Sequence, residues 1–213
     1  MIEVIPAILT DSSLKLKELV RNLEPYTTRV HIDIADGELV PNKTVTGYDE
    51  IKEIESALKF DVHLMVSDPA PYIKEWLHTQ ADRFIIHSES KCDHGSLINY
   101  LHQCKRKAGL AFNPETDVNK FKDSVIKADF VQFMMIHPGF QGQPFLTEVV
   151  DKISVFHKEN PDIIIMCDGG VTPERAPVLV KAGASALVSG SYIVKSQNIE
   201  EAIQNLKTAA GSM

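Results

Sequence analysis

The sequence predicts a single (β/α)8 barrel, the TIM-barrel fold, over residues 1–213. Short runs rich in Val, Ile and Leu recur eight times, and each is followed by a polar break and a segment whose apolar residues have helical spacing. The length suits eight such units, and no linker or low-complexity stretch divides the chain. An open, doubly wound parallel sheet is the alternative fold.

The apolar runs predict the strands, in order, at residues 2–9, 29–34, 60–66, 83–87, 108–113, 130–136, 163–168 and 186–189. The segments between them show the 3.6-residue period of helices, as in Leu14, Leu16, Leu19, Val20 and Leu23 or in Val149, Ile153 and Phe156. Capping residues precede three of the expected helices: Asp11 and Ser12, Ser67 and Asp68 before Pro69, and Thr172 with Pro173.

The composition indicates an ordinary soluble domain, with 44% hydrophobic and 24% charged residues. A net charge of -7, with KRK at 105–107 as the only basic cluster, argues against nucleic acid as a partner. No apolar stretch reaches membrane-spanning length, so we expect no membrane partner. The sequence leaves open whether the chain forms a homo-oligomer.

The cysteines and the N-terminus predict a cytoplasmic location. Cys92, Cys104 and Cys167 are odd in number and lack CxxC spacing, so neither a disulfide framework nor a thiolate metal site is expected. The first residues, MIEVIPAILTD, place Glu3 and Pro6 within a short apolar run, unlike a signal peptide.

Polar residues stand at the ends of four predicted strands. His31 and Asp33 are two residues apart, so they point to the same side of a strand that the DG pair at 36–37 ends. His63 lies in the third strand and Asp168 ends the seventh. Taken singly, each has a structural explanation, and His31 with Asp33 could be a self-satisfied hydrogen-bonded pair.

In a closed barrel, strands two and three are neighbours and strand seven lies across the mouth. The four side chains then converge, and two imidazoles with two carboxylates suit one divalent cation, with zinc, iron, manganese and cobalt equally compatible. His87, which with Glu89 ends the fourth strand, is expected to lie behind these ligands or to be structural.

Glycines follow the last three predicted strands, in HPGFQGQ at 137–143, DGG at 168–170 and SGS at 189–191. Without side chains, such loops let backbone N–H groups approach an anion, and barrels of this class commonly bind phosphate after strands seven and eight. Tight turns also need glycine, but three consecutive glycine-containing loops favour a phosphate site that needs no arginine clamp.

The segments HIDIADGELVPN, HLMV, HPGFQGQPF, CDGGV and SGS resemble, in order and spacing, the motifs of the ribulose-phosphate 3-epimerase family. The similarity runs from PAIL near Pro6 to Ser191. It implies a metal-dependent isomerase of the pentose phosphate pathway that inverts C3 of a ketose phosphate, D-ribulose 5-phosphate to D-xylulose 5-phosphate, through an enediolate.

The resemblance also assigns roles to residues. It implies a divalent metal held by His31, Asp33, His63 and Asp168, with Asp33 and Asp168 as the proton-transfer pair. Met65 and Met134 match methionines that cover the reacting carbon. The phosphate contacts map to Gly139, Phe140, Gln141, Gly142, Gly169, Gly170, Gly190 and Ser191.

Three positions depart from the family pattern. Ala7 replaces a serine, Ala35 replaces a third methionine, and Gln141 replaces a glycine. Because these changes alter the wall near the sugar, a hexulose phosphate such as allulose 6-phosphate is an alternative substrate. A catalytically silent barrel that only binds a sugar phosphate is a further alternative.

A metal-free barrel, such as a decarboxylase or a relative of hexulose-phosphate synthase, is a rival with different chemistry. Such enzymes need a lysine among their strand-end acids, and none stands at the ends of strands one to four.

Overall fold

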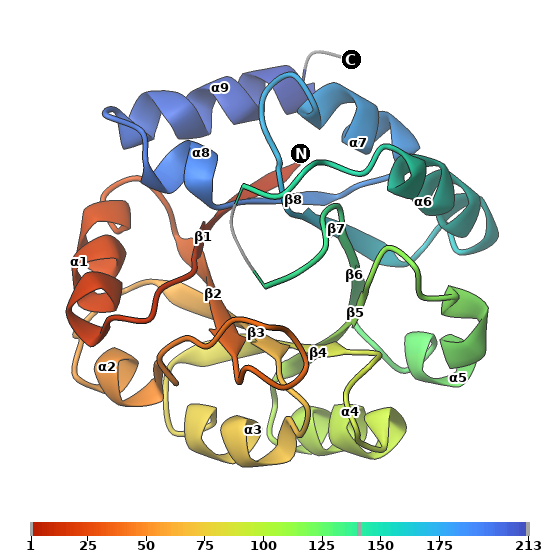
Figure 1. The fold of residues 1–213 in the computed structure, drawn as a ribbon, viewed down its shortest axis with the longest axis horizontal. Helices are drawn as coiled ribbons and strands as arrows, with labels where there is room; N and C mark the ends of the chain where they lie inside the picture. Colours follow the sequence, from red (N-terminus) through yellow and green to blue (C-terminus); the bar gives the residue numbers. More distant parts are fainter. Residues whose placement is uncertain (1, 140–141, 212–213) are drawn as a thin grey trace.

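The computed structural model describes residues 2–139 and 142–211, in which eight parallel strands close into a barrel (Figure 1). Neighbours in the barrel are neighbours in sequence, and β8 pairs with β1 to complete the ring. The predicted closed barrel is confirmed and the open sheet is wrong. The strands are β1 (Glu3–Ile8), β2 (Arg29–Ala35), β3 (Lys59–Met65), β4 (Ala81–His87), β5 (Lys107–Phe112), β6 (Phe130–Met134), β7 (Ile164–Asp168) and β8 (Ala186–Ser189).

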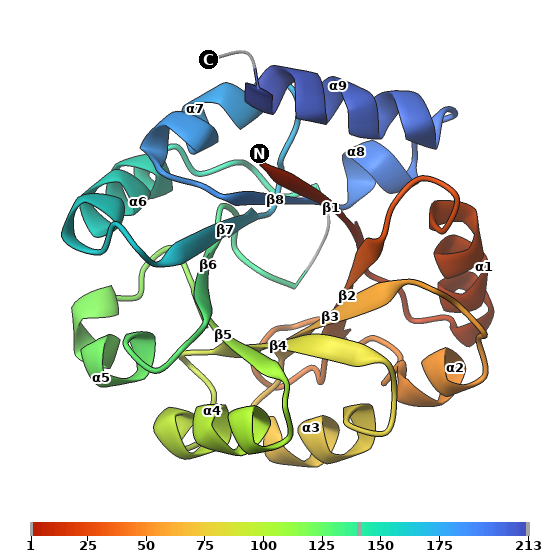
Figure 2. The ribbon, with the colours of Figure 1, turned by 180° about the vertical axis from the view of Figure 1, so that it is seen from behind.

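Helices surround the barrel and cover its outer surface, as the view from behind also shows (Figure 2). The fifth connection holds a short 3-10 helix, η1, before α5. The helical segments are α1 (Ser13–Leu23), α2 (Tyr48–Lys52), α3 (Ala70–Trp76), α4 (His94–Gln103), η1 (Val118–Phe121), α5 (Lys122–Val125), α6 (Glu148–Glu159), α7 (Ala176–Ala182), α8 (Ser191–Val194) and α9 (Ile199–Gly211).

Two details of the helices differ from the sequence prediction. Leu14 is 81% exposed, because it lies about 200° around the helix from Leu16, which faces the core. Thr172 does not cap a helix: residues 172–175 form a turn, and α7 begins only at Ala176. Ser12 does cap α1, where its side chain accepts a hydrogen bond from the Lys15 N–H at 3.3 Å.

The core has two layers, because strand side chains alternate between the inside of the barrel and the surrounding helices. The inner cluster is small and mixes bulky with short side chains: Ile5, Ala7, Ile85, Ala111, Phe130, Met166, Ala186 and Val188. The outer layer is larger and includes the fully buried Trp76, Phe84 and Phe133. No described helix is long and apolar enough to cross a membrane.

Charged side chains gather at the amino ends of the first four strands. Arg29 Nη1 lies 2.5 Å from Asp61 Oδ1 and 2.6 Å from Asp82 Oδ1. Arg83 Nη1 donates to Glu3 Oε2 at 3.0 Å. Burial raises the pKa of Asp61, while the nearby charge of Arg29 opposes that shift. These pairs keep charge at the end of the barrel opposite the carboxyl ends of the strands.

Replacing Gly109 with alanine should destabilise the barrel. A Cβ atom at Gly109 in β5 would lie 2.2 Å from Cε2 of Phe130, its partner in β6, and that ring is itself buried in the inner cluster. We expect Gly109→Ala to lower the free energy of unfolding by about 1–3 kcal/mol, as overpacking typically does. Urea denaturation measures this change.

Gly211→Ala is the matched control, because a Cβ atom there would meet no atom of the described residues within 4 Å. Equal unfolding free energies for the two variants would contradict the packing argument.

Candidate metal centre and active site

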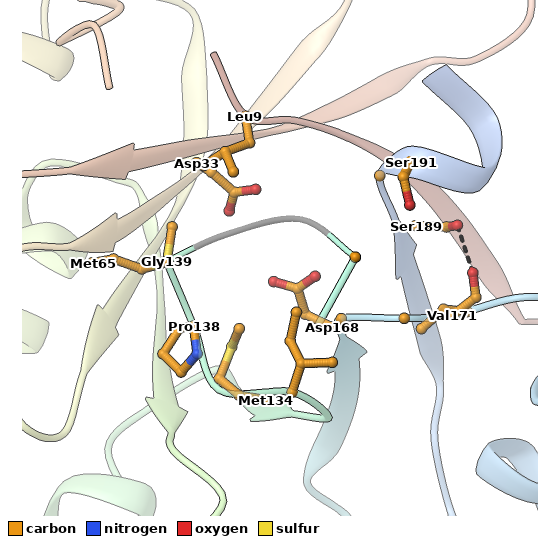
Figure 3. Close-up of a pocket in the computed structure, with 15 residues that line it drawn as sticks. Leu9, Asp33, Met65, Met134, Pro138, Gly139, Asp168, Val171, Ser189 and Ser191 are labelled. Carbon is orange, nitrogen blue, oxygen red and sulfur yellow. Dashed lines mark hydrogen bonds between the residues drawn. The ribbon is translucent and has the colours of Figure 1, made fainter. Parts of the chain in front are cut away.

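A pocket opens at the carboxyl ends of the strands, where the sequence analysis placed the site (Figure 3). Asp33 and Asp168 extend into it from opposite sides, and Met65 and Met134 form part of its wall. The remaining lining consists mainly of loop residues, including Leu9, Ile136, Pro138, Gly139, Gly142, Gly169, Gly170, Val171, Ser189, Gly190 and Ser191. No lysine is among the described residues that line this pocket.

The four predicted ligand side chains converge at the base of this pocket. His31 and Asp33 come from β2 and His63 from β3, where Asp33 and His63 are directly paired; Asp168 ends β7. One ligand atom from each lies within 4.8 Å of the others. The barrel thus brings together residues that are 137 positions apart in the sequence (168 − 31).

The spacing of these atoms suits a small divalent cation. His63 Nδ1 lies 2.8 Å from Asp33 Oδ1 and 3.5 Å from Asp168 Oδ2. His31 Nε2 lies 3.4 Å from Asp33 Oδ1 and 3.7 Å from Asp168 Oδ2. Ligands at ordinary nitrogen and oxygen distances from zinc are themselves about 3–4 Å apart. The cluster therefore has the dimensions of a metal centre.

His31 provides an independent indication that the cluster fits a metal ion. Its side chain is fully buried, and neither ring nitrogen forms a hydrogen bond within the described part of the chain. Buried polar atoms nearly always have a partner, because leaving one unpaired is unfavourable. A cation coordinated by Nε2 would supply that partner, so the residues present fit a metal ion.

The two aspartates have opposite electrostatic environments. Burial acts to raise the pKa of Asp33, but the close imidazoles of His31 and His63 outweigh it and hold this pKa below its usual range. Burial, aided by the negative charge of Asp33, raises the pKa of Asp168. The protein's own groups therefore favour an ionised Asp33, whereas Asp168 retains its proton to higher pH. This is the arrangement expected of an acid and base pair.

A chain of hydrogen bonds extends behind His63. Burial lowers the pKa of His63, so its imidazole is neutral and Nδ1 can act as a ligand when Nε2 carries the proton. His63 Nε2 lies 2.8 Å from His87 Nε2, and His87 Nδ1 lies 3.0 Å from Glu89 Oε2. This order fixes the tautomers: His63 donates to His87, which donates to Glu89.

Glu89 anchors that chain, and the sequence analysis gave it no role. Its other oxygen accepts hydrogen bonds from the Ser88 hydroxyl, the Asn113 N–H and the Thr116 hydroxyl. Although burial opposes the shift, His87, the Thr116 hydroxyl and the Asn113 N–H lower the pKa of Glu89 to about 2. The carboxylate is therefore a fixed negative charge, and His87 lies behind the ligand cluster.

The glycine loops line the pocket wall, with Gly169, Gly170, Gly190 and Ser191 after β7 and β8, and Gly139 and Gly142 after β6. Phe140 and Gln141, predicted with them, lie outside the described residues. Gly169 has φ +104, and a Cβ atom there would lie 2.5 Å from Ile136 Cγ1, so this turn requires glycine.

Two further residues near the pocket have roles that the sequence did not indicate. Arg175 donates to the Gly170 carbonyl at 2.6 Å and stacks on Phe145. These contacts place its positively charged guanidinium beside the glycine loops. Gln132, fully buried in β6, donates to Asp168 Oδ2 at 3.1 Å. Ala7, by contrast, belongs to the inner cluster and does not line the pocket.

Comparison with known proteins adds to this geometry. The model of the ribulose-phosphate 3 epimerase family matches residues 3–194. The chain belongs to this family. Ribulose-phosphate 3-epimerase from Bacillus subtilis is 33% identical over 216 residues, covering 97% of this chain and 99% of the relative. The chloroplastic ribulose-5-phosphate-3-epimerase of Arabidopsis thaliana is 34% identical, covering 97% of this chain and 76% of the relative.

Family membership confirms the resemblance noted in the sequence and places the chain among the isomerases. Solved structures of lower similarity share the fold. A 3-hexulose-6-phosphate synthase superposes with a TM-score of 0.71 at 17% identity, covering 98% of this chain and 99% of that structure. At this identity the likeness concerns the barrel alone, and it does not revive the metal-free alternative.

The hydrogen-bond chain predicts that Glu89→Gln weakens cation binding. The neutral amide cannot hold the His87 Nδ1 proton as the carboxylate does, so His63 is less well fixed as a ligand. We expect the affinity for Zn²⁺ or Co²⁺ to fall about 10- to 100-fold, as for other groups that orient metal-bound histidines. Competition with a chromophoric chelator measures it.

Glu115→Gln is the control, since Glu115 Oε1 pairs with His137 Nδ1 at 2.8 Å where both side chains are exposed. An unchanged affinity in the Glu89 variant would contradict the assigned order of hydrogen bonds.

Proposed function

We propose that the chain is a metal-dependent 3-epimerase that interconverts D-ribulose 5-phosphate and D-xylulose 5-phosphate. The observation that carries this proposal is the pair of carboxyls, Asp33 from β2 and Asp168 from β7, which face one pocket from opposite sides with opposite pKa shifts. The names of the curated relatives support the choice of substrate.

Inverting a carbon next to a carbonyl requires removal of its proton on one face and delivery of a proton to the other. A single fixed base cannot serve both faces, whereas two carboxyls on opposite sides can. In one direction a carboxylate takes the C3 proton, and the electron pair of the C–H bond forms the enediolate. The other carboxyl then donates its proton to the opposite face, and the carbonyl reforms.

His31, Asp33, His63 and Asp168 would hold one divalent cation, and zinc, iron, manganese and cobalt all suit this ligand set. When bound, such an ion supplies positive charge that stabilises the negative charge developing on the substrate oxygens.

The pocket wall suits the rest of the substrate. Met65 and Met134, each 3% exposed, would exclude water above the reacting carbon. The glycine loops after β6, β7 and β8 would offer backbone N–H groups to the phosphate, with Arg175 adding positive charge nearby. The three free cysteines are compatible with a reducing compartment such as the cytoplasm.

Purified protein should convert D-ribulose 5-phosphate to D-xylulose 5-phosphate, and treatment with a chelator should abolish turnover until a divalent metal is restored. A coupled assay for the xylulose epimer measures the rate, and elemental analysis measures the bound metal. Faster turnover of allulose 6-phosphate would overturn the choice of substrate. Binding of sugar phosphate without any epimer formed would identify a silent barrel.

Asp33→Asn should retain the fold and lose activity. The amide is similar in size but cannot accept the C3 proton, and removal of a general acid or base typically slows turnover about 10²- to 10⁴-fold. Steady-state kinetics with saturating metal measure the loss. Asp49→Asn, at an exposed position of α2, is the control and should retain full activity. A near-normal rate for Asp33→Asn would refute the two-carboxyl mechanism.

A further inference from the structure

A glutamine side chain lies inside the barrel, directly beneath the metal centre. Gln132 is the middle residue of β6, is fully buried, and is paired with Ala111 of β5 and Met166 of β7, which belong to the apolar inner cluster. The sequence around it, FVQFMM, is otherwise apolar. A polar amide at such a position needs an explanation from its contacts.

The amide nitrogen of Gln132 lies among three groups of the candidate site. It is 3.1 Å from Asp168 Oδ2, 3.3 Å from His63 Nε2 and 3.6 Å from Met134 Sδ. Since His63 Nε2 directs its own proton to His87, the acceptors for the two amide protons are Asp168 and, more weakly, Met134. Asp168 is ionised when it serves as a metal ligand, and turning the amide over would then place Oε1 against the carboxylate, so the orientation with nitrogen toward Asp168 is the favourable one in that state.

The amide oxygen of Gln132 is not stabilised by a hydrogen bond from the described part of the chain. Gln132 Oε1 is buried and has no hydrogen-bond partner among the described residues. Leaving a buried carbonyl unpaired is unfavourable, and a methionine of similar length would avoid it. Gln132 therefore lowers stability through its unpaired Oε1, while its Nε2 holds Asp168. Such a local cost is typical of positions that serve function.

The hydrogen bond from Gln132 reaches one oxygen, Oδ2, of Asp168. Asp168 Oδ2 is the oxygen that faces the ligand cluster, 3.5 Å from His63 Nδ1 and 3.7 Å from His31 Nε2. Asp33 has a different neighbour, since its Oδ1 lies 2.8 Å from His63 Nδ1 and makes no contact with Gln132 that the structure shows. A change at Gln132 should thus act on Asp168 far more than on Asp33.

We propose that Gln132 is a positioning residue for Asp168, holding Oδ2 at the ligand cluster so that Oδ1 faces the pocket for proton transfer. This inference rests on the proposed epimerase function. Its consequence is asymmetric: loss of the amide slows the proton transfer made by Asp168 and leaves the transfer made by Asp33 nearly unchanged.

The test compares Gln132→Met with the wild type at saturating metal, using D-ribulose 5-phosphate and D-xylulose 5-phosphate that carry deuterium at C3. Losing a hydrogen bond to a charged group should reduce kcat about 10- to 100-fold, with a small change in KM. The deuterium isotope effect should rise for the epimer whose C3 proton Asp168 removes. It should fall for the other epimer, because its C–H cleavage, by Asp33, is then no longer the slow step.

A second readout does not depend on turnover. Because Asp168 Oδ2 is the candidate ligand atom, affinity for Co²⁺ or Zn²⁺ in chelator competition should fall about 10-fold in Gln132→Met. Gln80→Met is the control with the same chemical change, at an exposed glutamine in the turn before β4. It should leave kcat, both isotope effects and metal affinity at wild-type values.

Opposite changes in the two isotope effects, together with weaker metal binding, would support the inference. Unchanged kcat, or isotope effects that move in the same direction for both epimers, would overturn it while leaving the epimerase function intact. If Gln132→Met does not fold, Gln132→Leu provides the same comparison. A wild-type protein that forms no epimer refutes the proposed function, and this inference falls with it.

Discussion

The structure depends on how four polar side chains are buried at one end of a closed barrel. Two imidazoles and two carboxyls lie so close that one nitrogen or oxygen atom of each is within 4.8 Å of the others. Removing these groups from water is unfavourable unless each finds a partner of complementary charge or a metal ion. The strands can bring them this close only because the sheet closes on itself, which places β7 opposite β2 and β3.

The surrounding residues show how that burial is stabilised. His63 is held through His87 by Glu89, and Asp168 is held by Gln132, so both are oriented by groups that do not themselves line the pocket. Below them lies an apolar layer that includes Ile5 and Ile85, and below that the ion pairs at the amino ends of the strands. The barrel interior is thus polar at both ends and apolar between them.

Much of this arrangement could be predicted from sequence because local pattern determines it. Alternating and apolar runs located every strand to within two residues, and the polar residues at strand ends identified the four members of the cluster. Glu89 was harder, because it stands in the polar segment SESKCD and looks like an ordinary loop residue. Its role depends on contact with Asn113 and Thr116, which follow a different strand.

The role of Gln132 could not be predicted for a different reason. Its position in an apolar run shows which face of the strand it is on, but not which side chains it contacts. Which side chains meet across a barrel depends on the stagger between strands, and no local pattern in the sequence encodes that stagger. Asp168 and Gln132 are 36 residues apart in the sequence, yet their contact depends on the pairing of Met134 with Asp168 between β6 and β7. The prediction that Thr172 caps a helix was also wrong. Residues that favour a helix start can equally form a separate turn before the helix, as they do here.

The difference between the two aspartates shows why such distant contacts matter. Asp33 and Asp168 are chemically identical, and in the proposed reaction each must act as an acid in one direction and as a base in the other. Their unequal surroundings, with imidazoles around Asp33 and, for Asp168, burial and the negative charge of Asp33, make one proton arrangement the resting one. Turnover of one epimer leaves the opposite arrangement, which is the form that accepts the product epimer. The barrel therefore need only keep both carboxyls fixed on opposite sides of the substrate, as the strands β2 and β7 that carry them do.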